Sequence, residues 1–107
     1  MARSIRLRNY ELADTMLKRA IGIMFRKKLT KPLVFPFSSE QIISIHSFFC
    51  IPFDAVFLDK NKRVVELNGN VKPFSFITTK RKSHYLVEMP AGSIEKFKIS
   101  LGDAVEF

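Results

Sequence analysis

Two acidic residues that could carry chemistry stand inside apolar, strand-like segments. Asp54 lies within FFCIPFDAVFLD, residues 48–59, the longest apolar run of the chain, and Glu88 lies within YLVEM, residues 85–89. An ionised carboxylate in an apolar strand must be paired or hydrogen-bonded, or it takes up a proton. Two hypotheses follow. Asp54 is a structural carboxylate satisfied by backbone N–H groups or by Arg26, or Asp54 and Glu88 perform acid–base chemistry in a pocket beside Arg26.

The remaining reactive side chains give weaker indications of a functional site. His46 and Cys50 do not have a useful metal-ligand spacing, and no second cluster completes a zinc site, so we expect no metal and no cofactor. Cys50 is flanked by apolar residues and is expected to be a buried, inert thiol. A nucleophilic role for Cys50 would need a base such as His46. No glycine loop of the usual phosphate-binding spacing is present.

Positive charge is unevenly distributed. The net charge is +8, and residues 1–31 alone carry nine basic and two acidic groups. A basic face attracts nucleic acid or another polyanion, anionic lipid or an acidic protein surface, and a solvated, solubilising face is the alternative. Phe74 and Phe76 precede a basic loop, and such aromatics can stack on the bases of a single strand. The candidate anion-binding residues are Lys27, Lys28, Lys80, Arg81 and Lys82.

Length and composition limit the class of protein. The 107 residues predict a single domain over the whole chain. Eleven phenylalanines are present without any tryptophan, and most of them are expected in the core, because an exposed set of that size would aggregate. One cysteine cannot form an internal disulfide. No apolar run reaches the roughly 18 residues of a membrane span. We therefore expect a cytoplasmic protein without a membrane span.

Strands are the predicted elements that must position these residues. Alternation predicts a strand within residues 3–9, and the i, i+4 spacing of Leu12 and Met16 predicts a helix over about residues 10–19. Further strands are predicted at residues 33–35, 43–58 with a break at Pro52, 63–67, 85–89 and 104–107, with a helical turn after Ser93. Asn68, Gly69 and Asn70 form the strongest turn signal. The prediction is a mainly β fold with a minor α part: a small β-barrel or strongly curved antiparallel sheet of six or seven strands, capped by one N-terminal helix.

Several segments in order resemble those of a known family. HSFFCIPFDAVFLD, NVKPF, YLVEMPAGS and ISLGDAVEF resemble the motifs of the domain-of-unknown-function 192 family, and the upstream GIMFRKKL resembles its other recurring segment. Together they run over about residues 17–107. Cys50 stands where a bulky apolar residue is expected, and Phe74 where tryptophan is common, and both are packing changes. The resemblance implies a small, largely β protein of archaea and bacteria, and it implies no reaction.

The sequence thus favours a protein of unknown function that is a non-catalytic binding or interaction module with a basic face for an anionic partner. This hypothesis predicts salt-sensitive binding to a polyanion. The alternative is a small-ligand binder or an enzyme, with Asp54, Glu88 and Arg26 close together around a pocket at the barrel mouth. A third hypothesis is an interaction subunit whose partner covers surplus phenylalanines.

Overall fold

The structure is a computed structural model that describes residues 3–13, 29–47 and 50–107. Within these residues the chain is mainly β. In order, the elements are β1 (Ser4–Arg6), β2 (Glu11–Leu12), β3 (Leu33–Gln41), β4 (Ser44–His46), β5 (Phe53–Leu58), β6 (Val64–Val71), β7 (Phe76–Thr78), β8 (Ser83–Pro90), α2 (Ser93–Lys96) and β9 (Ala104–Glu106). In this part of the chain, no helix has the length and apolar character that a membrane crossing requires.

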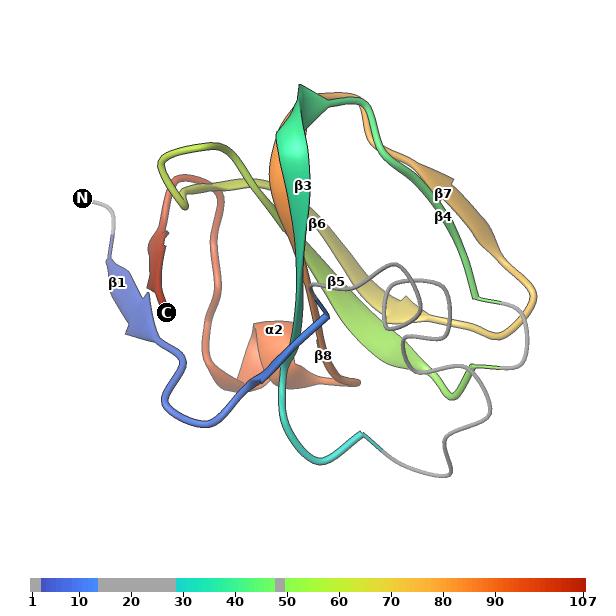
Figure 1. Cartoon of the computed structure of the whole chain (residues 1–107). Coiled ribbons are helices and arrows are strands. Elements are labelled where there is room, and N and C mark those ends of the chain that lie inside the picture. The colour runs from blue at the N-terminus through green and yellow to red at the C-terminus, as the bar shows by residue number, and fades with distance from the viewer. Residues whose placement is uncertain (1–2, 14–28, 48–49) are drawn as a thin grey trace.

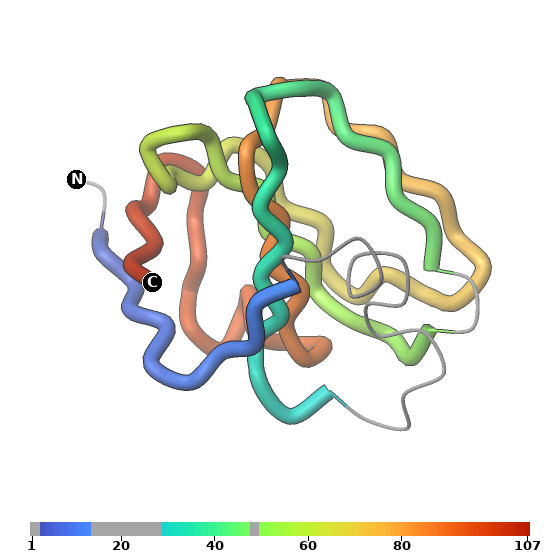
Figure 2. The backbone as a smooth tube through the Cα atoms, viewed as in Figure 1, coloured from blue at the N-terminus to red at the C-terminus, as the bar shows by residue number. Residues whose placement is uncertain are grey.

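A five-stranded sheet in the order β2-β3-β8-β5-β6 forms the centre of the molecule. Two smaller sheets flank it (Figure 1): β1 pairs with β9 in parallel, and β4 pairs with β7 in antiparallel. The β4–β7 pair projects to the right in Figure 1, and the β1–β9 pair lies on the left, where Figure 2 shows both chain ends. We call residues 42–47 and 71–82, which contain β4 and β7, the arm.

Both faces of the central sheet are buried, and strand alternation explains how. Every residue of β5 is buried, and successive side chains of a strand point to opposite faces. One set packs in cluster one: Ala13, Leu29, Leu33, Phe35, Ile43, Phe53, Ala55, Phe57, Val71 and Leu86. The other packs in cluster two: Leu7, Val34, Val56, Leu58, Val64, Val87, Met89, Ile99 and Val105. The arm contributes Ile43 and Val71 to cluster one, whereas β9 contributes Val105 to cluster two. The flanking sheets therefore cover opposite faces.

The predicted barrel and its N-terminal helix are wrong. Among the described residues the central sheet is open, since its edge strands β2 and β6 do not pair with each other. Separate layers cover the two faces, so closure of the sheet is not needed to bury them. Glu11 and Leu12, inside the predicted helix, form β2 and pair in parallel with β3, and residues 14–19 of that prediction lie outside the described residues. The helix that the structure does describe, α2, is short and near the C-terminus.

Two local predictions are also wrong, for reasons that lie in the pairing of strands. The strand predicted at residues 33–35 is longer than expected: β3 continues through Pro36 to Gln41, with a register shift between these two residues. The predicted turn at Asn68 and Gly69 lies inside β6, where the register between Phe53 and Ala55 shifts. The residues of β6 that face this shift include Asn70, whose φ is 49°. Gly69 and Asn70 thus form a β-bulge opposite Asp54 instead of a turn, while Asn68 remains paired with Ala55.

The expected helical turn after Ser93 and the closing strand are confirmed. Gly92, with a φ of 91°, precedes α2 in a left-handed conformation that glycine adopts without strain. β9 pairs with β1 at the other side of the molecule. Asp103, just before β9, accepts hydrogen bonds from the backbone N–H groups of Ser100 and Arg3. These two bonds lower the pKa of Asp103 below its ordinary value.

Candidate functional site

Asp54 lies near the start of β5, and two backbone N–H groups bind its carboxylate. Oδ1 accepts a hydrogen bond from the N–H of Asn70 at 2.8 Å, and Oδ2 accepts one from the N–H of Ile94 at 2.8 Å. The residue is 2% exposed. Its partners come from the end of β6 and from α2, so the carboxylate joins two elements that are remote in sequence. These contacts agree with the hypothesis that Asp54 is a structural carboxylate satisfied by backbone N–H groups.

Glu88 projects from the opposite face of the central sheet. In the pairing of β5 with β8, Asp54 lies opposite Met89, whereas Glu88 lies opposite Ala55. Residues directly opposite each other share a face, so Asp54 lies on the side of cluster two and Glu88 on the side of cluster one. The structure does not bring the two carboxylates into one pocket. Of the other residues of the predicted sites, Arg26, Lys27 and Lys28 lie outside the described residues.

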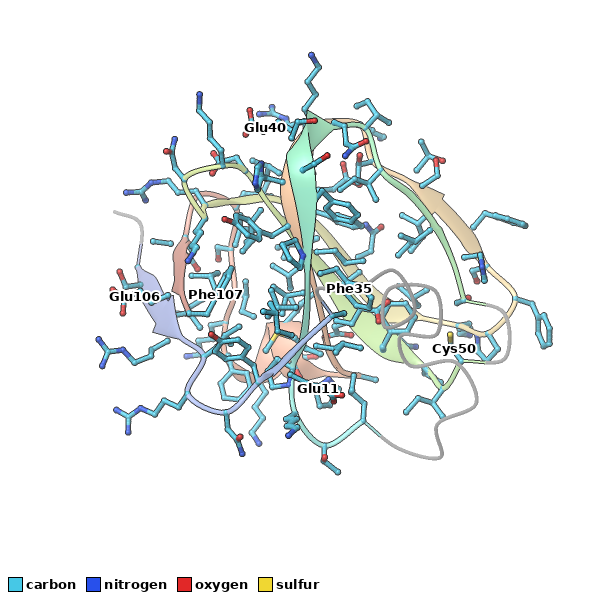
Figure 3. The ribbon with its side chains drawn as sticks, viewed as in Figure 1. Glu11, Phe35, Glu40, Cys50, Glu106 and Phe107 are labelled. Carbon is cyan, nitrogen blue, oxygen red and sulfur yellow. The ribbon has the colours of Figure 1, made fainter. Side chains whose placement is uncertain are left out.

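Cys50 lies just before β5 and packs against cluster one (Figure 3). Burial, and then the negative charge of Glu88, raise the pKa of the Cys50 thiol from 9.0 to about 11. A thiol with such a pKa is protonated at neutral pH and is a poor nucleophile. In the part of the chain that the structure describes, no three His, Cys, Asp or Glu side chains group together to hold a metal ion.

We expect the single cysteine to react slowly in the folded protein. At about pH 8, a pKa near 11 in place of 9.0 lowers the thiolate fraction about 100-fold, so alkylation by iodoacetamide should slow by a similar factor relative to the protein in denaturant. Because the folded pKa is the higher one, the associated stability is complete below pH 9.0 and is lost as the pH rises through about 11. Equal alkylation rates in the folded and unfolded protein would contradict this assignment.

Ser47 fixes the loop that precedes β7. The side chain is 1% exposed. Its Oγ donates a hydrogen bond to the carbonyl of Lys72 and accepts one from the N–H of Ser75 at 2.8 Å. Its backbone N–H donates to the carbonyl of Ser75, and its carbonyl accepts from the N–H of Phe74. This loop is therefore held at several points by one buried serine.

The loop and β7 present two aromatic rings to solvent. Phe74 is 63% exposed and Phe76 is 75% exposed. Phe74 also has a φ of 60°, which a bulky side chain adopts only at an energetic cost. Phe76 lies directly opposite His46 on the outer face of the arm, while the neighbouring Ile45 and Ile77 pack against cluster one. The outer face thus offers exposed rings that contribute little to the core.

The arm carries cations and no acidic residue. Its cations are Lys72, Lys80, Arg81 and Lys82, and all four residues are exposed. Glu66 accepts the N–H of Lys80 in the turn between β7 and β8, whereas Glu40 accepts the N–H of Lys60 in the turn between β5 and β6. These acidic groups come from β6 and β3, so the charged residues of the arm itself are all cations.

The sequence indicated the basic loop but not how the aromatic rings are placed. Phenylalanines in strands are usually buried, and the expectation of a core position fails for Phe74 and Phe76. The sequence did contain an indication of an exposed segment, because residues 71–84 combine four cations with no acidic residue. The role of Ser47 had no signal of its own, since its partners lie about 25 residues further along the chain.

The fold and this site define a small, mainly β protein with an open central sheet and a basic arm that exposes aromatic rings. The family model described as "Uncharacterized ACR, COG1430", the domain-of-unknown-function 192 family, matches residues 2–107, and the chain belongs to this family. The resemblance noted in the sequence is therefore confirmed. The function of the family is unknown.

The chain is similar to archaeal relatives and to two solved structures. A UPF0127 protein of Pyrococcus furiosus is 38% identical over 89% of this chain and 83% of the relative, and one of Pyrococcus horikoshii is 35% identical over 90% and 84%. A protein of unknown function from Novosphingobium aromaticivorans has a TM-score of 0.85 at 25% identity, covering 92% of this chain and 74% of that one. A Sinorhizobium meliloti 1021 structure has a TM-score of 0.83 at 23% identity, covering 89% and 78%, which shows the fold alone.

Proposed function

We propose that this protein is a non-catalytic module that binds single-stranded nucleic acid through the arm. The observation that carries the proposal is the exposure of Phe74 and Phe76 on a segment with four cations and no acid. Exposed rings on a rigid support provide surfaces on which unpaired bases stack, and the cations attract the phosphate backbone. Because the loop is fixed by Ser47, the rings are ordered before any ligand arrives.

The geometry favours this function over acid–base catalysis. Asp54 and Glu88 lie on opposite faces of the central sheet, and the Cys50 thiol is protonated at neutral pH. Binding of unpaired bases, in contrast, requires only exposed rings and positive charge on the same segment. For the same chain we propose a single domain that works in a reducing, cytoplasmic environment, since the single cysteine suits such a compartment.

Fluorescence anisotropy with a labelled 12-nucleotide single strand, as DNA and as RNA, tests the proposal. We expect the double variant Phe74→Ala/Phe76→Ala to lose at least about tenfold in affinity, since base–aromatic stacking contributes about 1–3 kcal/mol per base. Removal of the three cations Lys80, Arg81 and Lys82 by alanine should reduce the slope of log K against log salt by about 2, at roughly 0.7 per phosphate contact.

Two controls separate stacking from charge. Phe97→Ala removes another exposed ring, 47% exposed, outside the arm, and should leave the affinity unchanged. Inorganic polyphosphate and duplex DNA offer phosphates without unpaired bases and should bind more weakly than the single strand. Equal binding of polyphosphate, together with unchanged affinity of the Phe74 and Phe76 variant, would overturn the proposal.

A further inference from the structure

A cavity of about 420 Å³ lies on the other side of the central sheet from the arm, between β1 and the turn that leads into α2. Both cationic and apolar side chains line it. The cations are Arg6, Arg8 and Lys96, and the apolar side chains include Leu7, Met89 and Phe97. Among the residues that the structure describes, no acidic side chain lines the cavity. This volume is in the range of sites that bind small organic molecules.

The two walls of the cavity are held together by hydrogen bonds that do not depend on a ligand. The guanidinium of Arg3, at the start of the β1 wall, donates to the carbonyls of Phe97 and Lys98 beyond α2. On the other side, the Asp54 carboxylate fixes the N–H of Ile94 in α2. Both contacts set the position of the wall that carries Lys96 and Phe97. A site formed in advance in this way loses little ordering entropy when a ligand binds.

The floor is closed below. Leu7 and Met89 are 9% and 4% exposed and belong to cluster two. The void beneath them measures only about 10 Å³, which is too small for a ligand group. An apolar ligand body would therefore lie along the floor and not enter the core.

Charge is distributed so that an anion is favoured at the rim. Among the acidic residues near the cavity, Glu106 pairs with Nε of Arg6 at 3.2 Å, where both side chains are at least half exposed. Such an exposed pair contributes little energy and leaves the other donors of the guanidinium available. Glu95 is in α2 but does not line the cavity. Arginine side chains bind carboxylate and phosphate groups through two parallel hydrogen bonds.

We propose that this cavity binds a small amphipathic anion, in which one carboxylate or phosphate group is joined to an apolar body. The head group meets the cations Arg6, Arg8 and Lys96, and the body covers Leu7, Met89 and Phe97. This site is separate from the arm and does not require the arm to bind nucleic acid.

Titration of the full chain with octanoate and with octyl phosphate, followed by ¹H–¹⁵N NMR, tests the proposal. We expect saturable shifts for the amides of residues 5–9 and 91–97 and none for those of β4 and β7. Octanol lacks the charge, whereas acetate and inorganic phosphate lack the apolar body, and all three should bind at least about tenfold more weakly. Equal binding of octanol or of inorganic phosphate would overturn the proposal, because either part alone would then suffice.

Two sets of variants with the same charge change provide the matched comparison. Alanine at Arg6, Arg8 and Lys96 should weaken octanoate binding at least about tenfold, whereas alanine at Lys80, Arg81 and Lys82 should leave it unchanged. Near-UV circular dichroism confirms that both variants are folded. An equal loss in both sets would show a general charge effect and overturn the site. Binding to anionic phospholipid vesicles without binding of octanoate or octyl phosphate would overturn it as well.

Discussion

Replacement of Asp54 by alanine is expected to lower the free energy of unfolding by about 2–6 kcal/mol, because two part-buried backbone N–H groups then lose their charged acceptor at about 1–3 kcal/mol each. Those groups belong to Asn70 and Ile94, and Asp54 itself is 2% exposed, so water cannot easily replace the carboxylate. Asp54→Asn should be less damaging, since the amide keeps one acceptor oxygen but turns an NH₂ group toward the second N–H. Equilibrium unfolding in urea measures the change.

Asp59 provides the matched control for this substitution. Its Oδ1 also accepts two backbone N–H groups, those of Asn61 and Arg63, at 2.9 and 3.0 Å. It lies in a turn that solvent reaches, so Asp59→Ala should cost only about 1 kcal/mol, as for an exposed helix cap. If Asp54→Ala and Asp59→Ala lowered the free energy of unfolding by the same amount, burial of the Asp54 carboxylate would not be the reason for its effect on stability.

Ser47→Ala is expected to release the aromatic loop of the arm and to cost about 1–3 kcal/mol of stability. The hydroxyl both donates to the Lys72 carbonyl and accepts from the Ser75 N–H, and alanine does neither. Amide hydrogen exchange at Phe74 and Ser75 should become faster, and the affinity for a single strand should fall because the rings are no longer fixed. The exchange measurement is independent of the proposed function.

Ser44→Ala makes the same chemical change elsewhere on the arm. The Ser44 hydroxyl contacts the Thr78 hydroxyl at 3.0 Å on the exposed face, where water can replace either partner. We expect a loss below about 0.5 kcal/mol and unchanged exchange at Phe74. If Ser44→Ala loosened the loop as much as Ser47→Ala, the buried serine would not be what holds it.

The strands with continuous apolar runs could be predicted, because burial on both faces leaves a strong signal. β5 and β8 were expected from their composition, and Pro52 correctly divided the segment before β5. The short strand β2 could not be predicted, since two residues show no periodicity and their partner is β3, about 20 residues away. The spacing of Leu12 and Met16 therefore suggested a helix instead.

The candidate site shows the same limit. Asp54 could be recognised as a carboxylate that needs a fixed partner, but the sequence did not contain the register of β5 against β8. That register, with Asp54 opposite Met89, sets the two carboxylates on different faces. At the bulge, the N–H of Asn70 binds a carboxylate 16 residues earlier in the chain, a contact that local composition, which predicted a turn, does not contain.

The position of Asp54 has a consequence for any ligand of this protein. One oxygen holds Asn70, two residues before Lys72 at the root of the arm, and the other holds Ile94 in α2, the helix whose Lys96 lines the cavity. A single carboxylate therefore sets the position of the backbone at both surfaces. Loss of the Asp54 carboxylate would thus release the backbone at both surfaces together, although each surface binds its own ligand independently.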